Sequence, residues 1–323
     1  MKQKTMRQSS ARKKTRECSL CAWMAFALVP FLAASCQDRI HEVDEPVSSD
    51  KVPVRIRVSS IEQIPFGTAI TKASVNDVCT KLSFAVFSSM DEDAVKEESV
   101  IQNSTDSLFG LISLNLSVGR HYIAVVGQTG GDGNPSLTAT KANNSFNTFS
   151  IRYVSNNKSQ PKVQDTFHYF AAIDVTSGEN DFQVDLSRSV AMFRLNLTED
   201  IPSQVRKLEF DYSNGSATLD VISGYGCVNT KQTETIDVDP TMHTFELYTF
   251  PQRGKDVMKM SVRALDVYGN AVCEMNWNDI PMTVNRVSQY TGDLFQNGCK
   301  EFSQTGFPIN VNNEWAGTDS QTF

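Results

Sequence analysis

The segment Ile112–Gly127, ISLNLSVGRHYIAVVG, sets the fold class of this 323-residue chain. Its first half alternates apolar and polar residues, which is the period of a β-strand with one buried face. Gly119-Arg120 then permits a turn, and the second half is apolar on both faces, as expected of a central strand. The segment therefore predicts a β-hairpin that lies inside a sheet.

The same alternation recurs along the chain from Val52 onward, whereas only Asp91–Val100 has a pattern that fits a helical turn or two. Asn214-Gly215 and Gly269-Asn270 stand between apolar runs, as hairpin turns do. Short strands at regular spacing predict an all-β chain built of antiparallel β-sandwiches. The further strands are expected at Val52–Ser59, Leu82–Val86, Phe182–Leu186, Ala191–Leu197, Val205–Tyr212, His243–Thr249, Val257–Leu265, Ala271–Trp277, Val287–Phe295 and Phe307–Val311.

The length suits two domains of about 130 residues each. Hydrophobic residues make up 40% of the chain and include 19 phenylalanines, enough for two packed cores. The best break lies near Ser187, so the expected domains are residues 51–187 and 188–323. They follow residues 1–35, which we interpret as a signal peptide, and residues 36–50, which we interpret as an acidic tether.

The N-terminus has the pattern of an export signal. A basic stretch from Lys2 to Arg16 precedes an apolar stretch of about 15 residues, which is short for a membrane-spanning helix. It ends in Ala33-Ala34-Ser35-Cys36, which resembles a bacterial lipobox. That resemblance implies a lipoprotein in which Cys36 carries fatty acids such as palmitate. An ordinary signal peptide cut near Ala34 is the alternative.

Charge is unevenly distributed along the chain. Residues 1–35 hold seven Lys/Arg and one acid, a balance of +6, so the net charge of −7 leaves −13 for the rest. A surface that acidic argues against nucleic acid as a partner. Residues 37–50 contain five acids and read as a solvated tether, although they also resemble the surface-export signal of Bacteroidetes lipoproteins.

No catalytic or ligand-binding motif stands out, so we expect no enzyme activity, no cofactor and no metal. The four histidines lack metal-ligand spacing, and no nucleophile elbow is present. Asp237 and Asp239 with Glu234 form an acidic stretch that lacks the further oxygens and the glycine of a calcium loop. Asp106-Ser107-Leu108 fits the acceptor pattern of Bacteroidetes O-glycosylation and makes Ser107 a candidate for modification.

The sequence leaves open which cysteines form disulfide bonds. Cys79, Cys227, Cys273 and Cys299 allow three pairings, and no spacing singles one out. Small buried side chains are the simplest interpretation. A Cys227–Cys273 bridge is one candidate in an oxidising compartment.

Three segments together resemble the Bacteroidales fimbrillin superfamily of pilins, anchors and tip subunits. They are SLNLSVGRHYIAVVGQT (113–129), FQVDLSRSVAMFRLNL (182–197), and RVSQYTGDLF (286–295) followed by FPINVNNEW (307–315). The resemblance implies two tandem transthyretin-like β-sandwiches. It also implies assembly with other fimbrial subunits by exchange of β-strands, after export to the outer membrane and cell surface.

The family's assembly sites can be placed on this chain. The exchangeable first strand corresponds to Val52, Val54, Ile56 and Val58, with Pro53 predicting a sheet edge. Polymerising family members are cut after a basic residue, and here Lys72-Ala73 stands where Arg-Ala is often found. An anchor or tip subunit that is never cut would have the same sequence. The resemblance therefore implies a fimbrial subunit or fimbrium-like adhesin that could contact host or bacterial surface ligands.

The alternative is a surface glycan-binding lipoprotein. For that function Trp277 and Trp315 would be the sugar platform, although both suit strand packing better.

Overall fold

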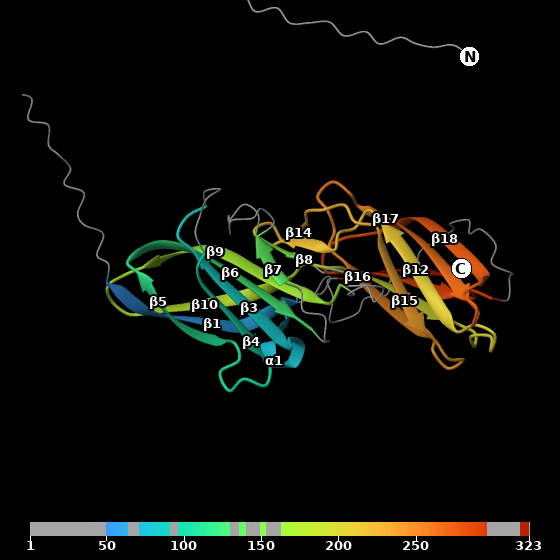
Figure 1. Ribbon diagram of the computed structural model, residues 1–323, viewed down its shortest axis with the longest axis horizontal. Helices are drawn as coiled ribbons and strands as arrows, with labels where there is room; N and C mark the ends of the chain where they lie inside the picture. Colours follow the sequence, from blue (N-terminus) through green and yellow to red (C-terminus); the bar gives the residue numbers. More distant parts are fainter. Residues whose placement is uncertain are drawn as a thin grey trace, which may run out of the picture. The chain divides into compact units, whose positions relative to one another are not determined.

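The computed structural model describes residues 50–63, 71–90, 96–129, 136–139, 149–152, 163–295 and 317–322. Nearly all of the regular secondary structure in this part of the chain is β-strand, and its one α-helix is the single turn α1 (Val75–Val78). The expected all-β fold is confirmed (Figure 1). The helix expected at 91–100 is wrong for residues 96–100, which form the start of a strand.

The first sheet contains eight strands and folds over itself into two layers. One layer has β1 at its centre, next to β10, with β5 and β2 along its other side; the second layer has the order β9-β6-β3-β4. Only two residue pairs join β9 to β10, at the corner between the layers. The strands are β1 (Lys51–Gln63), β2 (Thr71–Ala73), β3 (Lys81–Phe87), β4 (Lys96–Asn103), β5 (Leu111–Ser117), β6 (Gly119–Gln128), β9 (Thr166–Val175) and β10 (Asn180–Arg188).

A second sandwich follows, made of two four-stranded sheets with the orders β16-β11-β19-β20 and β15-β12-β17-β18. Gly269 (φ 82°) turns β17 into β18, so that expected hairpin is confirmed. Asn214-Gly215 instead leads from β12 into another sheet and makes no hairpin. The strands are β11 (Ala191–Leu197), β12 (Lys207–Ser213), β15 (Gln232–Asp237), β16 (Thr244–Thr249), β17 (Val257–Leu265), β18 (Ala271–Pro281), β19 (Arg286–Gly292) and β20 (Gly317–Thr322).

A small sheet combines segments that are distant in sequence, in the order β14-β13-β8-β7. Its strands are β7 (Ser136–Ala139), β8 (Phe149–Arg152), β13 (Thr218–Asp220) and β14 (Tyr225–Gly226). It therefore links residues that precede Ser187 to residues that follow it.

The buried apolar side chains form three clusters. One lies inside the first sandwich and one inside the second. The third contains side chains from both halves, among them Phe87 and Val126 from the first, and Met192 and Leu219 from the second. Residues 46–323 accordingly form one compact unit, and the division at 187/188 stays a prediction.

Strand β6 shows why a segment can be apolar on both faces. Ile123 and Val125 point into the first cluster, while Ala124 and Val126 belong to the shared cluster. The strand lies between β9 and β3, so the central position predicted from its sequence is confirmed. The hairpin predicted for residues 112–127 is wrong, because β5 pairs with β1 in the other layer and not with β6.

Candidate strand-exchange site

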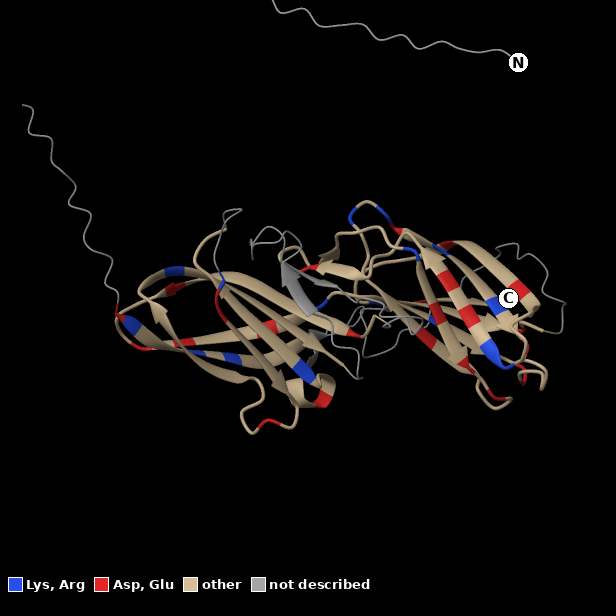
Figure 2. Ribbon diagram, viewed as in Figure 1, with Lys and Arg blue, Asp and Glu red and all other residues tan. Residues whose placement is uncertain are grey.

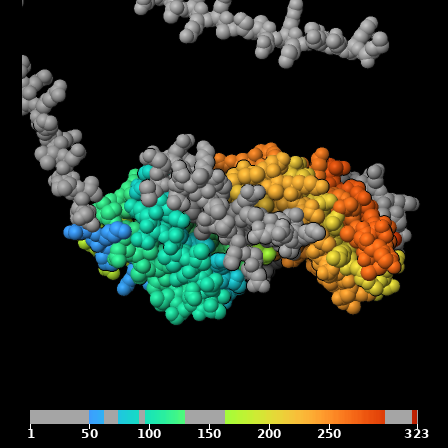
Figure 3. Space-filling model, in the orientation of Figure 1, coloured from blue at the N-terminus to red at the C-terminus, as the bar shows by residue number. Residues whose placement is uncertain are grey.

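Strand β1 fills a gap between two other strands of its layer. It pairs in parallel with β10 from Val54 onward and antiparallel with β5 from Lys51 to Arg57. Val54 and Ile56 are fully buried and Val58 is 5% exposed, whereas Val52 is partly buried. In the view of Figure 3 only a small part of this first strand reaches the surface. The predicted plug residues therefore do point into the core of the first sandwich.

The edge position predicted from Pro53 is wrong, because β1 has neighbours on both sides. The Pro53 carbonyl oxygen accepts a hydrogen bond from Asn180 Nδ2 at 3.5 Å, so it faces β10. The N and O atoms of one strand residue point to the same side, so the missing N–H also faces β10. Pairing with β10 begins only at Val54, and proline therefore leaves no ladder bond unmade.

A β-bulge at Ser59 changes the phase of the strand. The register with β10 shifts between Val58 and Ser60, so the fully buried Ile61 continues the apolar face although it breaks the alternation. The hydroxyls of Ser59 and Ser60 both donate to Asp185 Oδ1, at 2.6 and 2.5 Å. These two bonds fix the bulge against β10.

The other predicted site residues lie apart from one another. Lys72 and Ala73 belong to β2, which pairs with Glu62 and Ile61 at the far end of β1. Ser107 lies in the exposed turn between β4 and β5, where the Asn103 N–H donates to Asp106 Oδ2. Cys36 and Trp315 lie outside the described residues.

The bonding states of the cysteines contradict the candidate disulfide. Cys273 is disulfide-bonded, while Cys79 and Cys227 carry free thiols, so a Cys227–Cys273 bridge is wrong. Cys79 is buried, and burial raises the pKa of its thiol to about 12. This thiol stays protonated and acts as a small apolar side chain, which is the simple interpretation made from sequence.

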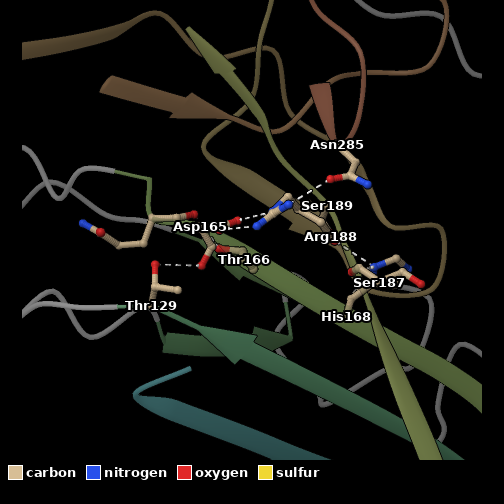
Figure 4. Close-up of polar contacts among 9 residues, drawn as sticks. Thr129, Asp165, Thr166, His168, Ser187, Arg188, Ser189 and Asn285 are labelled. Atoms are coloured by element: carbon tan, nitrogen blue, oxygen red, sulfur yellow. Dashed lines mark hydrogen bonds and ion pairs between the residues drawn. The ribbon is translucent and has the colours of Figure 1, made fainter. Parts of the chain in front are cut away.

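Arg188 forms a buried junction at the end of β10 (Figure 4). Its Nε and Nη2 donate to the two Asp165 carboxylate oxygens at 2.8 and 3.0 Å, and its Nη1 donates to Asn285 Oδ1 at 2.9 Å. The guanidinium lies 4.9 Å from the centre of the Phe167 ring. Asn285 has φ 59° in the turn before β19, so Arg188 ties the first sandwich to the second.

His168 lies beside this junction and contacts the β13–β14 turn. The Ser189 hydroxyl is 2.7 Å from its Nδ1, and burial lowers the pKa of the imidazole. Ser189 has no exposed surface, so this hydroxyl–imidazole pair cannot meet a substrate in this conformation. A Cβ on Gly224 (φ 71°) would lie 2.2 Å from the imidazole, so only glycine permits this packing.

Within the described ranges no group of three histidine, cysteine or acidic side chains is arranged to hold a metal ion. In the same part of the chain, no helix has the length and apolarity needed to span a bilayer.

Solved structures similar to this one include a fimbrial anchor protein and candidate adhesion proteins. A candidate adhesin of Bacteroides ovatus has a TM-score of 0.48 and 12% identity, over 86% of this chain and 100% of that chain. A candidate cell adhesion protein of Bacteroides eggerthii gives 0.47 and 12%, over 84% and 98%. The fimbrial anchor protein Mfa2 of Porphyromonas gingivalis gives 0.45 and 10%, over 72% and 83%. No family model and no curated protein matches the chain.

Proposed function

We propose that this protein is a fimbrial subunit or fimbrium-like adhesin, held at the outer membrane through acylated Cys36 and assembled by exchange of β-strands. The position of β1 carries the proposal. It is the first strand that the structure describes, and the strands on its two sides would form an open groove without it. A terminal strand can leave and be replaced without threading the chain. Backbone hydrogen bonds on both sides would then hold the replacement, and the buried alternate positions would select its side chains.

Cleavage after Lys72 would release β1 together with most of β2. In the described sheet β2 pairs only with β1, so one side of its backbone is unpaired. Arg55 and Arg57 also expose basic side chains, but their backbone lies between β5 and β10. A protease that binds its substrate as an extended strand would therefore reach Lys72 before either arginine.

A donor from the C-terminal part of a second copy must be apolar. Strand β20 has the sequence GTDSQT, which offers no apolar side chain for the pockets of Val54 and Ile56. Residues 307–311, FPINV, do place apolar side chains at the alternate positions Phe307, Ile309 and Val311. We assign the donor role to this segment of a neighbouring subunit.

N-terminal sequencing of protein taken from intact cells tests the proposal. A polymerised subunit is expected to begin at Ala73 and to form detergent-resistant ladders, which Lys72→Gln should abolish and the control Arg57→Gln should leave unchanged. Protein that begins only at acylated Cys36 would indicate an anchor, provided that it still captures subunits. Protein without lipid, ladders or captured subunits would refute the proposal.

A surface glycan-binding lipoprotein remains the second candidate. Trp277 is only 4% exposed and packs against Phe193 and Tyr290, so it belongs to the core and cannot be a sugar platform. A cleft elsewhere in the second sandwich is the observation that favours this function.

A further inference from the structure

We infer that a cleft around Arg253 and Tyr225 binds a carboxylate-bearing sugar. The cleft has a volume of about 490 Å³ and lies between the loop that joins β16 to β17, the end of β18 and strand β14. This inference deepens the adhesive part of the proposed function, and it does not depend on strand exchange. It follows from the charges in the cleft, the rigidity of its walls and its size.

The cleft presents two cations. Figure 2 shows blue segments on the loop between β16 and β17, which contains Arg253 and Lys255. Among the described residues Arg253 has no ion pair and no hydrogen-bonded acceptor, while Lys255 Nζ has only the Gln252 side-chain oxygen, at 3.4 Å. The donors of both side chains are therefore available to an anion.

Arg253 is held in place before any ligand binds. Its guanidinium lies 5.2 Å from the centre of the Tyr225 ring, and this cation–π contact favours that position. A fixed guanidinium offers two parallel N–H groups to a carboxylate and loses little entropy on binding. Tyr225 is still 36% exposed, so part of its surface can contact a ligand.

The walls of the cleft are rigid. Gln252 Nε2 donates to the backbone oxygens of Asn214 and Gly215 at 2.7 and 3.0 Å, at the base of the loop. Gly254 has φ 75°, and the Lys255 N–H donates to the Gln252 oxygen at 3.1 Å, which closes the turn. On the other wall the Met282 N–H donates to the backbone carbonyl oxygen of Asp256 at 2.8 Å. A preformed site of this kind needs little reorganisation on binding.

The remaining polar groups favour a sugar over an acidic peptide. Asp256 and Thr283 are exposed on the walls and can bond to hydroxyl groups, one as an acceptor and the other as donor or acceptor. A peptide with several carboxylates would instead be repelled by Asp256. The volume also suits one or two sugar rings better than an extended peptide.

Calorimetric titration of the purified mature protein with an aldobiouronic acid, a disaccharide with a single carboxylate, tests this inference. Binding is expected, and the neutral methyl ester of the same disaccharide should bind about ten- to a hundredfold more weakly. Arg253→Gln should weaken binding of the acid by a similar factor without further weakening the ester. The control Arg120→Gln, an exposed arginine of the first sandwich, should change affinity less than about twofold.

Four results would overturn the inference. They are equal affinity for acid and ester, an unchanged affinity in Arg253→Gln, binding of tri-glutamate as tight as that of the sugar, and no binding of the acid at millimolar concentration. None of them affects the ladders and N-termini that test strand exchange, so failure of one proposal can be told from failure of the other.

Discussion

Deletion of residues 51–60 is expected to remove most of the stability of the first sandwich. The deletion takes away Val54, Ile56 and Val58, each at most 5% exposed. At roughly 1.5–3 kcal/mol for each buried side chain, the loss is about 5–9 kcal/mol, which is an upper value because unfolded chains already bury some surface. Whole domains have a margin of about 5–15 kcal/mol, so the sandwich should unfold or capture another strand.

Urea unfolding followed by circular dichroism measures this loss. The deleted protein should lose part of the transition, and a synthetic peptide of residues 51–61 or 305–313 should restore it. Ile56→Ala in the intact protein should cost about 2–5 kcal/mol. The neighbouring exposed Arg57→Ala should stay within about 0.5 kcal/mol.

Two results would refute this argument. The first is a deleted protein that unfolds like the intact one and ignores both peptides, since β1 would then not be a plug. The second is an equal cost for Ile56→Ala and Arg57→Ala, since burial would then not be the source of stability.

Three further predictions concern the anchor and the junction. Cys36→Ser should release the protein from membranes and abolish labelling by a fatty-acid probe; retention without label in the unchanged protein would count against lipidation. Arg188→Met leaves the Asp165 carboxylate buried without its cation and should cost about 3–5 kcal/mol, most of it recovered in the double variant with Asp165→Leu, and full additivity would argue against the pair. Burial lowers the pKa of His168 in the folded protein. As the pH falls below about 6.5, this imidazole therefore takes up a proton in the unfolded state before it does so in the folded state, which lowers the free energy of unfolding. The stability advantage of the unchanged protein over His168→Gln should therefore shrink between pH 7.5 and pH 5, and a constant difference would contradict the assignment.

Sequence patterns predicted best where one face of a strand is buried and the other exposed. Strand β17 begins and ends at Val257 and Leu265, as expected, because its residues alternate without a break. The helix expected at Asp91–Val100 is wrong for residues 96–100, because Lys96-Glu97-Glu98 favours a helix in isolation. In the structure these charges lie on β4, an edge strand that pairs with β3, where charge is common.

The candidate sites depend on contacts between distant segments, and local patterns do not report such contacts. Nothing near Arg188 in the sequence indicates Asp165 or Asn285 as its partners. The cleft at Arg253 needs Tyr225, which comes from another strand. The plug residues could be predicted because they all lie on one strand.

The position of proline connects the first strand to its proposed replacement. Residues 52–56 read VPVRI, and residues 307–311 read FPINV, so both place proline between the first two of three alternating apolar residues. In β1 this proline is tolerated because its missing N–H faces the side where pairing with β10 has not yet begun. A donor strand with Ile309 at the position of Val54 would place Pro308 at the position of Pro53, where proline is tolerated. A shift of one residue toward the C-terminus of β1 would place Pro308 inside the ladder with β10. It would also turn the apolar side chains of the donor away from the core. Under the proposed exchange, a register that aligns the two prolines would place Phe307 at the partly buried entrance and Val311 in the pocket of Ile56.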